Sequence, residues 1–239
     1  MTRMLYREDA YRRDAPAVVQ QITPEGGIVL DQSLFYPTGG GQPGDSGWIS
    51  WDGQRLPIAT TVKGEGGAIV LVPAEASALP PQGAHVVHEL DWDRRHKHMR
   101  VHTALHLLSV SMPFAVTGGQ VAATHGRLDF DMPDAPHDRD GIQDELNEFV
   151  DLDLRVSEGW MTQADLAANP HLVKTMAVRP PKGAEDVRLI RIGEDNGWID
   201  LQPCGGTHVA RTGEIGALRL GKIENKGRMN RRVYLHLDS

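Results

Sequence analysis

The chain contains two short stretches whose residue types and spacing could bind a metal ion. In the first, His102-Thr-Ala-Leu-His106, two histidines lie four residues apart. If this stretch is helical, both imidazoles lie on one face about 5 to 6 Å apart, close enough to bind one ion. The second, Cys204-Gly-Gly-Thr-His208, supplies a thiolate and an imidazole separated by three small residues. A ligand set of three histidines and one cysteine is typical of zinc, whereas magnesium and calcium prefer oxygen ligands.

A purely structural explanation of the same residues stays open. In it, Leu105, Leu107 and Leu108 form core, the histidines are hydrogen-bonded polar groups beside that core, and Cys204 is a small buried hydrophobic residue. An HxxxH pattern alone arises often by chance. The only cysteine of the chain, however, lies four residues before a histidine and beside glycines. Together the two stretches therefore predict one zinc site.

The N-terminal part of the chain predicts a small antiparallel β-barrel or sandwich. Its β-prone runs are separated by turns such as Thr23-Pro-Glu-Gly-Gly27 and Lys63-Gly-Glu-Gly-Gly67. Strands are expected at 18–22, 28–30, 48–51, 56–62, 68–72 and 85–90. Since 239 residues are many for one compact domain and few for two large ones, we expect unequal domains at 1–90 and 91–239.

A glycine-rich stretch, Phe35-Tyr-Pro-Thr-Gly-Gly-Gly-Gln-Pro-Gly-Asp-Ser-Gly47, lies inside the first domain. Three successive glycines expose backbone N–H groups and permit positive φ, so a ligand could approach this loop closely. The spacing matches neither a Walker A motif nor a dinucleotide fingerprint. A tight structural turn is the alternative. In a binding loop, Thr38 and Gln42 would be the polar side chains.

The second domain is predicted to be α+β, with helices and an antiparallel sheet. A helix over 93–111, ending before Pro113, would carry the first two ligands. Its run of Arg94, Arg95, Lys97 and Arg100 predicts a solvated helix face, with phosphate contact as the alternative. Further helices are expected at 140–154 and 163–168, and strands at 155–161, 187–192 and 198–202. Hairpins are expected at 119–131, turning at His125-Gly126, and at 216–237, turning at Asn225-Lys-Gly227.

Basic residues gather around the last hairpin, and they could bind RNA phosphates or protect an edge strand by charge. They are Lys222, Lys226, Arg228, Arg231 and Arg232. The net charge of −7 excludes a uniformly basic nucleic-acid binder but allows a local patch. One cysteine cannot form an internal disulfide, and no run resembles a signal peptide or a membrane span. A cytoplasmic location is therefore expected.

Three motifs occur in a definite order: Gly39-Gly-Gly-Gln42, His102-Thr-Ala-Leu-His106, and Cys204-Gly-Gly-Thr-His208 followed by Gly213-Glu-Ile-Gly216 and Arg231-Arg232. From about residue 35 to the C-terminus, the chain resembles the free-standing alanyl-tRNA editing proteins (AlaX-type) and the editing domain of alanyl-tRNA synthetase. HxxxH and CxxxH patterns also occur in threonyl-tRNA synthetases. The GGGQ stretch resembles the motif of the alanyl-tRNA editing proteins, and in particular of those that carry an N-terminal barrel.

The resemblance implies hydrolysis, in trans, of the ester that joins a wrong amino acid to alanine tRNA. The wrong amino acid would be chiefly serine and, where the glycine-rich motif is present, glycine. The implied zinc ligands, one ion per chain, are His102, His106, Cys204 and His208, and the implied amino-acid pocket is lined by Gly39, Gly40, Gly41 and Gln42. Thr38 departs from the glutamate expected before the glycines in many relatives, which bears on the choice of amino acid.

Editing is needed because a pocket that fits alanine cannot reject glycine and discriminates against serine by about a hundredfold at best. A second site could accept the serine hydroxyl through Gln42, Thr103 or Thr207. Zinc could lower the pKa of an attacking water, or it could anchor the substrate while glycine-loop N–H groups stabilise the oxyanion. Two other functions stay open: a zinc hydrolase of small esters or amides, and a non-catalytic RNA-binding module with structural zinc.

Overall fold

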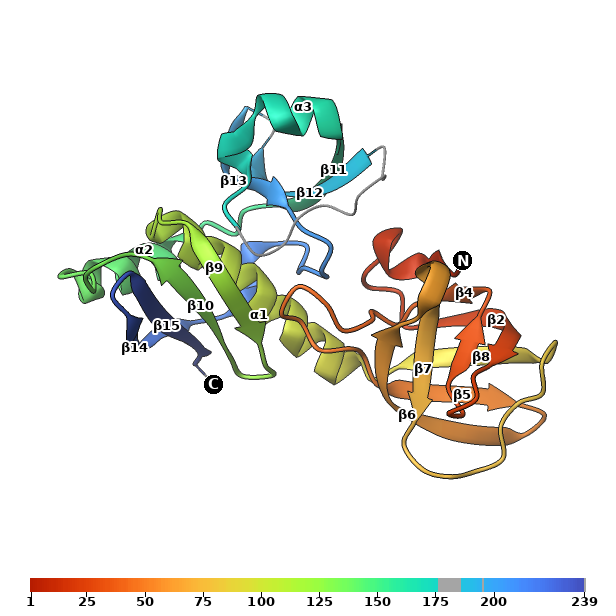
Figure 1. Cartoon of the computed structure of the whole chain (residues 1–239). Coiled ribbons are helices and arrows are strands. Elements are labelled where there is room, and N and C mark those ends of the chain that lie inside the picture. Colours follow the sequence, from red (N-terminus) through yellow and green to blue (C-terminus); the bar gives the residue numbers. More distant parts are fainter. Residues whose placement is uncertain (176–185, 195, 239) are drawn as a thin grey trace. The chain divides into compact units, whose positions relative to one another are not determined.

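The computed structural model describes residues 1–175, 186–194 and 196–238. They form two compact units, Met1–Lys97 and His98–Ser239 (Figure 1). The first is a β-barrel, and the second combines helices with antiparallel sheets. This architecture confirms the predicted fold class. The functional roles assigned to 1–90 and 91–239 stay predictions.

Six strands close the barrel of the first unit, in the order β2-β3-β7-β6-β5-β8, and all neighbours pair antiparallel. They are β2 (Asp14–Ile22), β3 (Ile28–Leu30), β5 (Gly47–Trp51), β6 (Gln54–Lys63), β7 (Ile69–Pro73) and β8 (His85–Leu90). Each overlaps a predicted strand. A short parallel pair, β1 (Arg3–Met4) with β4 (Gln32–Ser33), lies outside the barrel order.

The barrel interior follows from the alternation of side chains along its strands. In β8, exposed and buried residues alternate strictly, as expected for a strand with one face inward. Ile28, Leu30, Ile49 and Leu71 are completely buried in the resulting core. Gly47 allows β5 to approach β8, because a Cβ at this position would lie 2.1 Å from the carbonyl oxygen of Glu89.

Helix α1 (Trp92–Ser111) is the long helix predicted for the first two ligands. The Asp91 carboxylate accepts a hydrogen bond from the Arg94 N–H at 3.2 Å and so caps its start. The helix ends two residues before Pro113, which has no N–H to continue it.

One part of the solvated-face prediction for α1 was wrong. Arg95 is fully buried, because its guanidinium lies against the buried carboxylate of Asp45. Arg100 also forms a hydrogen bond within the protein, since its Nε donates to the carbonyl oxygen of Ile215 at 2.8 Å.

The second unit contains two antiparallel sheets, ordered β14-β15-β10-β9 and β11-β12-β13. The strands are β9 (Val116–Val121), β10 (His125–Asp131), β11 (Val156–Thr162), β12 (Asp186–Glu194), β13 (Gly197–Pro203), β14 (Leu218–Gly227) and β15 (Asn230–Leu237). The helices are α2 (Arg139–Asp151), which is shorter than predicted, and α3 (Gln163–Ala168), as predicted. Asp153 has a φ of 47°, which is incompatible with continuing α2.

Two predicted hairpin turns were misplaced. His125 and Gly126 belong to β10, where Gly126 pairs with Val121 and Leu235. The glycine serves close packing, because a Cβ there would lie 2.8 Å from Cγ1 of Val101 on α1.

The second misplaced turn is Asn225-Lys-Gly227, which forms the irregular end of β14 rather than the turn itself. Gly227 has a φ of 151°, and its N–H donates to Oδ1 of Asn225 at 3.0 Å. The chain therefore reverses just after this segment.

Among the helices of the described residues, none combines the length and the hydrophobicity that a membrane span requires.

Candidate metal centre

The two histidines of the first motif lie one helical turn apart on α1. The ring centroids of His102 and His106 are 5.4 Å apart, and both side chains are buried. The helical geometry expected from the sequence is therefore present.

The second motif follows β13 directly and brings its cysteine and histidine to the same place. The four ligand atoms of His102, His106, Cys204 and His208 all lie within 4.8 Å of one another. The Cys204 Sγ lies 3.5 Å from Nε2 of His102 and 3.3 Å from Nε2 of His208. A tetrahedral zinc with ordinary bond lengths would separate sulfur and nitrogen by about 3.6 Å. The residues present therefore fit a zinc ion in donor type and spacing.

Hydrogen bonds on the far side of the rings orient two of the imidazoles. Nδ1 of His106 lies 2.9 Å from Oδ2 of the buried Asp200, so this nitrogen donates. Nδ1 of His208 lies 3.1 Å from Oγ1 of Thr103, and that hydroxyl donates to the carbonyl oxygen of Met99 at 3.0 Å. The hydroxyl therefore accepts from His208. In both rings, the proton on Nδ1 leaves the Nε2 lone pair for a metal ion.

The electrostatics favour metal ligation at Cys204 and His208, whereas His106 must release a proton when an ion binds. Burial raises the pKa of the Cys204 thiol, but the neighbouring imidazoles of His102 and His208 outweigh burial and hold it well below its usual range. Burial, together with the charge of His102, lowers the pKa of His208 to about 3. Burial also lowers the pKa of His106, but hydrogen bonds to Asp200 and Cys204 outweigh it and raise the value to about 9. A thiolate and a neutral imidazole are the forms that bind zinc.

Asp200 connects the helix to the strand that leads into Cys204. Besides His106, its carboxylate accepts hydrogen bonds from Lys174 Nζ at 2.6 Å and from Gln202 Nε2 at 2.8 Å. Gln202 Nε2 also donates to Ser109 Oγ of α1 at 3.2 Å. These contacts tie β13 to α1 and fix the orientation of the His106 ring.

We expect Asp200→Asn to lower zinc affinity about 10- to 100-fold, the usual effect of losing the partner of a metal-bound histidine. The amide cannot supply the carboxylate charge that holds His106 in its present orientation. Competitive titration with a chromophoric chelator would measure the change. Asp144→Asn, on the exposed side of α2, is the matched control and should bind zinc like the unsubstituted protein. Equal affinity of the two variants would contradict this role of Asp200.

Arg188 of β12 hydrogen-bonds to the backbone of residues 204–208, which are called the metal-binding loop below. Its Nη1 donates to the carbonyl oxygens of Cys204 at 2.9 Å and Gly206 at 2.8 Å. Its Nε and Nη2 pair with the carboxylate of Glu158 at 2.9 and 2.6 Å. The buried guanidinium thus fixes the curvature of the loop without contacting the ligand atoms named above.

The glycine-rich stretch forms a tight turn within the first unit. The N–H of Gly39 donates to the carbonyl oxygen of Gln42 at 3.1 Å, and the reverse bond is 3.0 Å long. Gly40 and Gly41 have φ values of 56° and 81°, which glycine adopts without strain. Two of the four N–H groups thus close the turn. A binding role for the loop stays a prediction.

The polar side chains predicted for the amino-acid pocket differ in their surroundings. Thr38 is exposed, and its hydroxyl donates to the Thr61 carbonyl at 3.2 Å and accepts from the Gly44 N–H at 2.9 Å. Gln42, Thr103 and Thr207 are buried. The hydroxyl of Thr103 contacts Nδ1 of the candidate ligand His208 at 3.1 Å. The pocket roles of Thr38, Gln42, Thr103 and Thr207 stay predictions.

The basic cluster at the last hairpin is partly neutralised by acidic neighbours. Lys222 forms an ion pair with the carboxylate of Glu224, and Nζ of Lys226 lies 4.0 Å from the same carboxylate. Arg232 pairs with Asp129 at 2.7 Å, and Arg231 donates to backbone oxygens, including that of Gly227 at 2.7 Å. Within the described residues, Arg228 is exposed and has no ion pair. Phosphate binding by this group stays a prediction.

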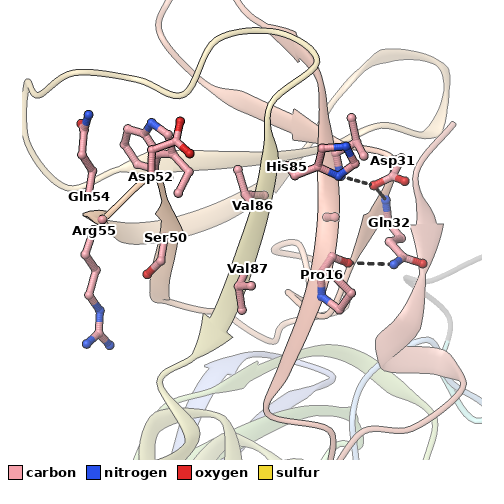
Figure 2. A pocket seen from close by; sticks show the side chains of 14 residues that line it. Pro16, Asp31, Gln32, Ser50, Asp52, Gln54, Arg55, His85, Val86 and Val87 are labelled. Atoms are coloured by element: carbon pink, nitrogen blue, oxygen red, sulfur yellow. Dashed lines mark hydrogen bonds between the residues drawn. The ribbon is translucent and has the colours of Figure 1, made fainter.

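A pocket of about 720 Å³ lies on the barrel, among β2, β8 and the turn between β5 and β6 (Figure 2). Two of its polar side chains form hydrogen bonds with the backbone of β2. Gln32 Nε2 donates to the Pro16 carbonyl oxygen at 2.8 Å, and Oδ1 of Asp31 accepts from the Val18 N–H at 2.8 Å. None of its lining residues belongs to the predicted metal or amino-acid site.

Sequence reasoning missed Asp200, Arg188 and Thr103 as supports of the ligands. Asp200 could have been predicted from the sequence. It lies two residues before Gln202 on the strand that leads to Cys204, so the two polar side chains must share one face of that strand. No comparable signal identifies Arg188, since its contacts depend on the pairing of two distant strands.

Two family models match the chain. "tRNA synthetases class II (A)" matches residues 11–94, which include the barrel, and "Threonyl and Alanyl tRNA synthetase second additional domain" matches residues 187–234, which include Cys204 and His208. Parts of both units are therefore similar to domains of aminoacyl-tRNA synthetases.

Relatives that match almost the whole chain identify its family within this class of proteins. The alanyl-tRNA editing protein AlaX-M of Methanosarcina acetivorans is 32% identical over 99% of both chains, and that of Saccharolobus solfataricus is 32% identical over 98% of both. The alanine–tRNA ligase of Pyrobaculum neutrophilum is 34% identical over 93% of this chain but only 25% of its own length. The chain belongs to the family of alanyl-tRNA editing proteins of the AlaX-M type, which confirms the resemblance found in its motifs.

Proposed function

We propose that the protein is a zinc-dependent deacylase that acts in trans on alanine tRNA carrying serine or glycine. The observation that carries this proposal is the convergence of one thiolate and three imidazoles in a chain that matches editing proteins over almost its whole length. The tRNA would be the substrate partner, bound through its acylated 3′ end.

The residues that would hold zinc are His102, His106, Cys204 and His208. When bound, the ion would supply a positive charge at the reacting ester or at the substrate amino group. Asp200 and Thr103 would keep the imidazoles of His106 and His208 aligned, and Arg188 would keep the loop of Cys204 in place. The chain thus provides a preorganised site whose ligands need not rearrange during each turnover.

The reaction is the hydrolysis of an ester. Water attacks the carbonyl carbon of the aminoacyl group, and the bond from that carbon to the ribose oxygen breaks. One water proton passes to the ribose oxygen, and the products are a free amino acid and a tRNA with a restored hydroxyl. Preference for serine over alanine would come from a pocket that offers a hydrogen bond to the serine hydroxyl, because alanine has no group to accept or donate it.

The test is to incubate the protein with alanine tRNA charged with serine, glycine or alanine, with and without a chelator. We expect loss of the serine and glycine esters, persistence of the alanine ester, and at least about 100-fold slower hydrolysis after chelation, because the ion stabilises developing charge. Readdition of zinc should restore the rate. Survival of every ester would contradict the proposal. Equal rates on free aminoacyl esters and on aminoacyl-tRNA would instead indicate a hydrolase of small esters.

A further inference from the structure

A row of three residues crosses the three-stranded sheet next to the metal centre. In the register of β11 and β12, Trp160 lies directly opposite Arg188. On the other side of β12, the N–H of Cys204 donates to the carbonyl oxygen of Arg188 at 3.2 Å. The sheet order β11-β12-β13 therefore places Trp160 and Cys204 two strand spacings apart, which is about 10 Å.

The Trp160 indole lies on the same sheet face as the metal-binding loop. Side chains of directly opposed residues share a face, and so do residues i and i+2 of one strand. Arg188 opposes Trp160 and donates to loop carbonyl oxygens, while Glu158, two residues before Trp160, pairs with Arg188. The other face packs against α3, where Met161 and Val187 join the cluster around Leu166 (Figure 1).

Trp160 is 56% exposed although its row neighbour Arg188 is buried. A single exposed aromatic residue needs no explanation by itself. Here, however, the exposed ring lies in the same row as the candidate ligand Cys204, two strands away and on the same face of the sheet. A flat apolar surface at that distance from a reacting ester is suited to stacking a nucleobase.

We propose that Trp160 stacks against the terminal adenine of the acylated tRNA. This inference rests on the proposed function. In aminoacyl-tRNA, the ester and the terminal base are attached to the same ribose, so a base platform must lie about one nucleotide from the reacting carbonyl group. Trp160 meets this requirement, and Arg188, which pairs with Glu158, fixes the spacing between the platform and the loop of Cys204. Trp160 is thus a substrate-positioning residue.

The test compares three serine esters: seryl alanine tRNA, the serine ester of adenosine, and serine methyl ester, which has no base. We expect Trp160→Ala to raise KM about 5- to 150-fold for the first two, the usual effect of removing one stacked base, with little change in kcat. KM for the methyl ester and the zinc content should not change. Trp160→Phe should restore most of the affinity, since it keeps an aromatic face.

Trp198→Ala is the matched control. Trp198 is 42% exposed and lies on the same sheet, but it is six residues from Cys204 along the strand, or about 20 Å away. This variant should leave KM for all three esters unchanged.

Three results would overturn the inference. They are an unchanged KM of Trp160→Ala for the adenosine ester, an equal loss on the methyl ester, and a change of oligomeric state in sedimentation that accounts for the loss. Failure of the unsubstituted protein on all three esters would reject the proposed function itself, so the two failures are distinguishable.

Discussion

Replacing Cys204 by alanine is expected to remove most of the bound zinc and to slow deacylation of seryl-tRNA by more than about 100-fold. The thiolate is the only anionic ligand among the four, and it lies 3.3 and 3.5 Å from two of the imidazole nitrogens. Loss of a direct ligand should exceed the 10- to 100-fold loss of affinity that follows removal of an outer partner. Metal analysis of the purified variant and single-turnover deacylation would measure the two effects.

A conservative variant separates loss of the metal from loss of the loop structure. Cys204→Asp keeps an anionic ligand, so it should retain more zinc than Cys204→Ala, with an activity between that of the alanine variant and that of the unsubstituted protein. Circular dichroism should show that both variants remain folded, because the loop is also held by Arg188 through carbonyl oxygens. If Cys204→Ala lost its zinc but kept the native rate, the metal centre would have no role in catalysis, and if it kept both, Cys204 would not be a required ligand.

The barrel was predictable because its signals are local. Each strand is a short β-prone run between turns, and alternation such as that of β8 follows directly from the residue types. The helix of the first two ligands was predictable for the same reason, since Pro113 marks its end and the four-residue spacing of its histidines fixes their common face.

The errors occurred where a residue's role depends on a distant partner. Glycine at 126 was interpreted as a turn former, whereas it allows α1 to pack closely on β10 through Val101. Arg95 was assigned to a solvated face because it lies in a charged run, and its carboxylate partner Asp45 is 50 residues earlier. No periodicity in the sequence connects these pairs. The four candidate ligands were an exception, because cysteine and histidine in CxxxH and HxxxH spacings predict a shared metal site without knowledge of the fold, and the structure brings their ligand atoms within 4.8 Å of one another.

Asp45→Asn is expected to destabilise the barrel unit by about 3 to 5 kcal/mol, the usual cost of breaking a buried ion pair from one side. Both side chains are almost fully buried, and Nε of Arg95 lies 3.0 Å from each carboxylate oxygen. Arg95 also donates to the carbonyl oxygens of Leu34 at 2.6 Å and Ala10 at 3.0 Å, and Asp45 accepts from the Tyr36 N–H at 2.6 Å. The variant would leave a buried guanidinium without a compensating charge at the point where these segments meet.

Urea denaturation followed by hydrogen exchange of barrel peptides would measure this loss separately from the second unit. Glu89→Gln is the matched control, because its partner Arg55 lies at a similar distance of 3.0 Å but both side chains are about half exposed. Exposed pairs contribute at most about 1 kcal/mol, so this variant should unfold almost like the unsubstituted protein. Replacing the buried pair together, as Arg95→Met with Asp45→Leu, should recover much of the lost stability, since no charge then remains buried. Equal effects of Asp45→Asn and Glu89→Gln would show that burial of the Arg95 pair does not determine the stability of this unit.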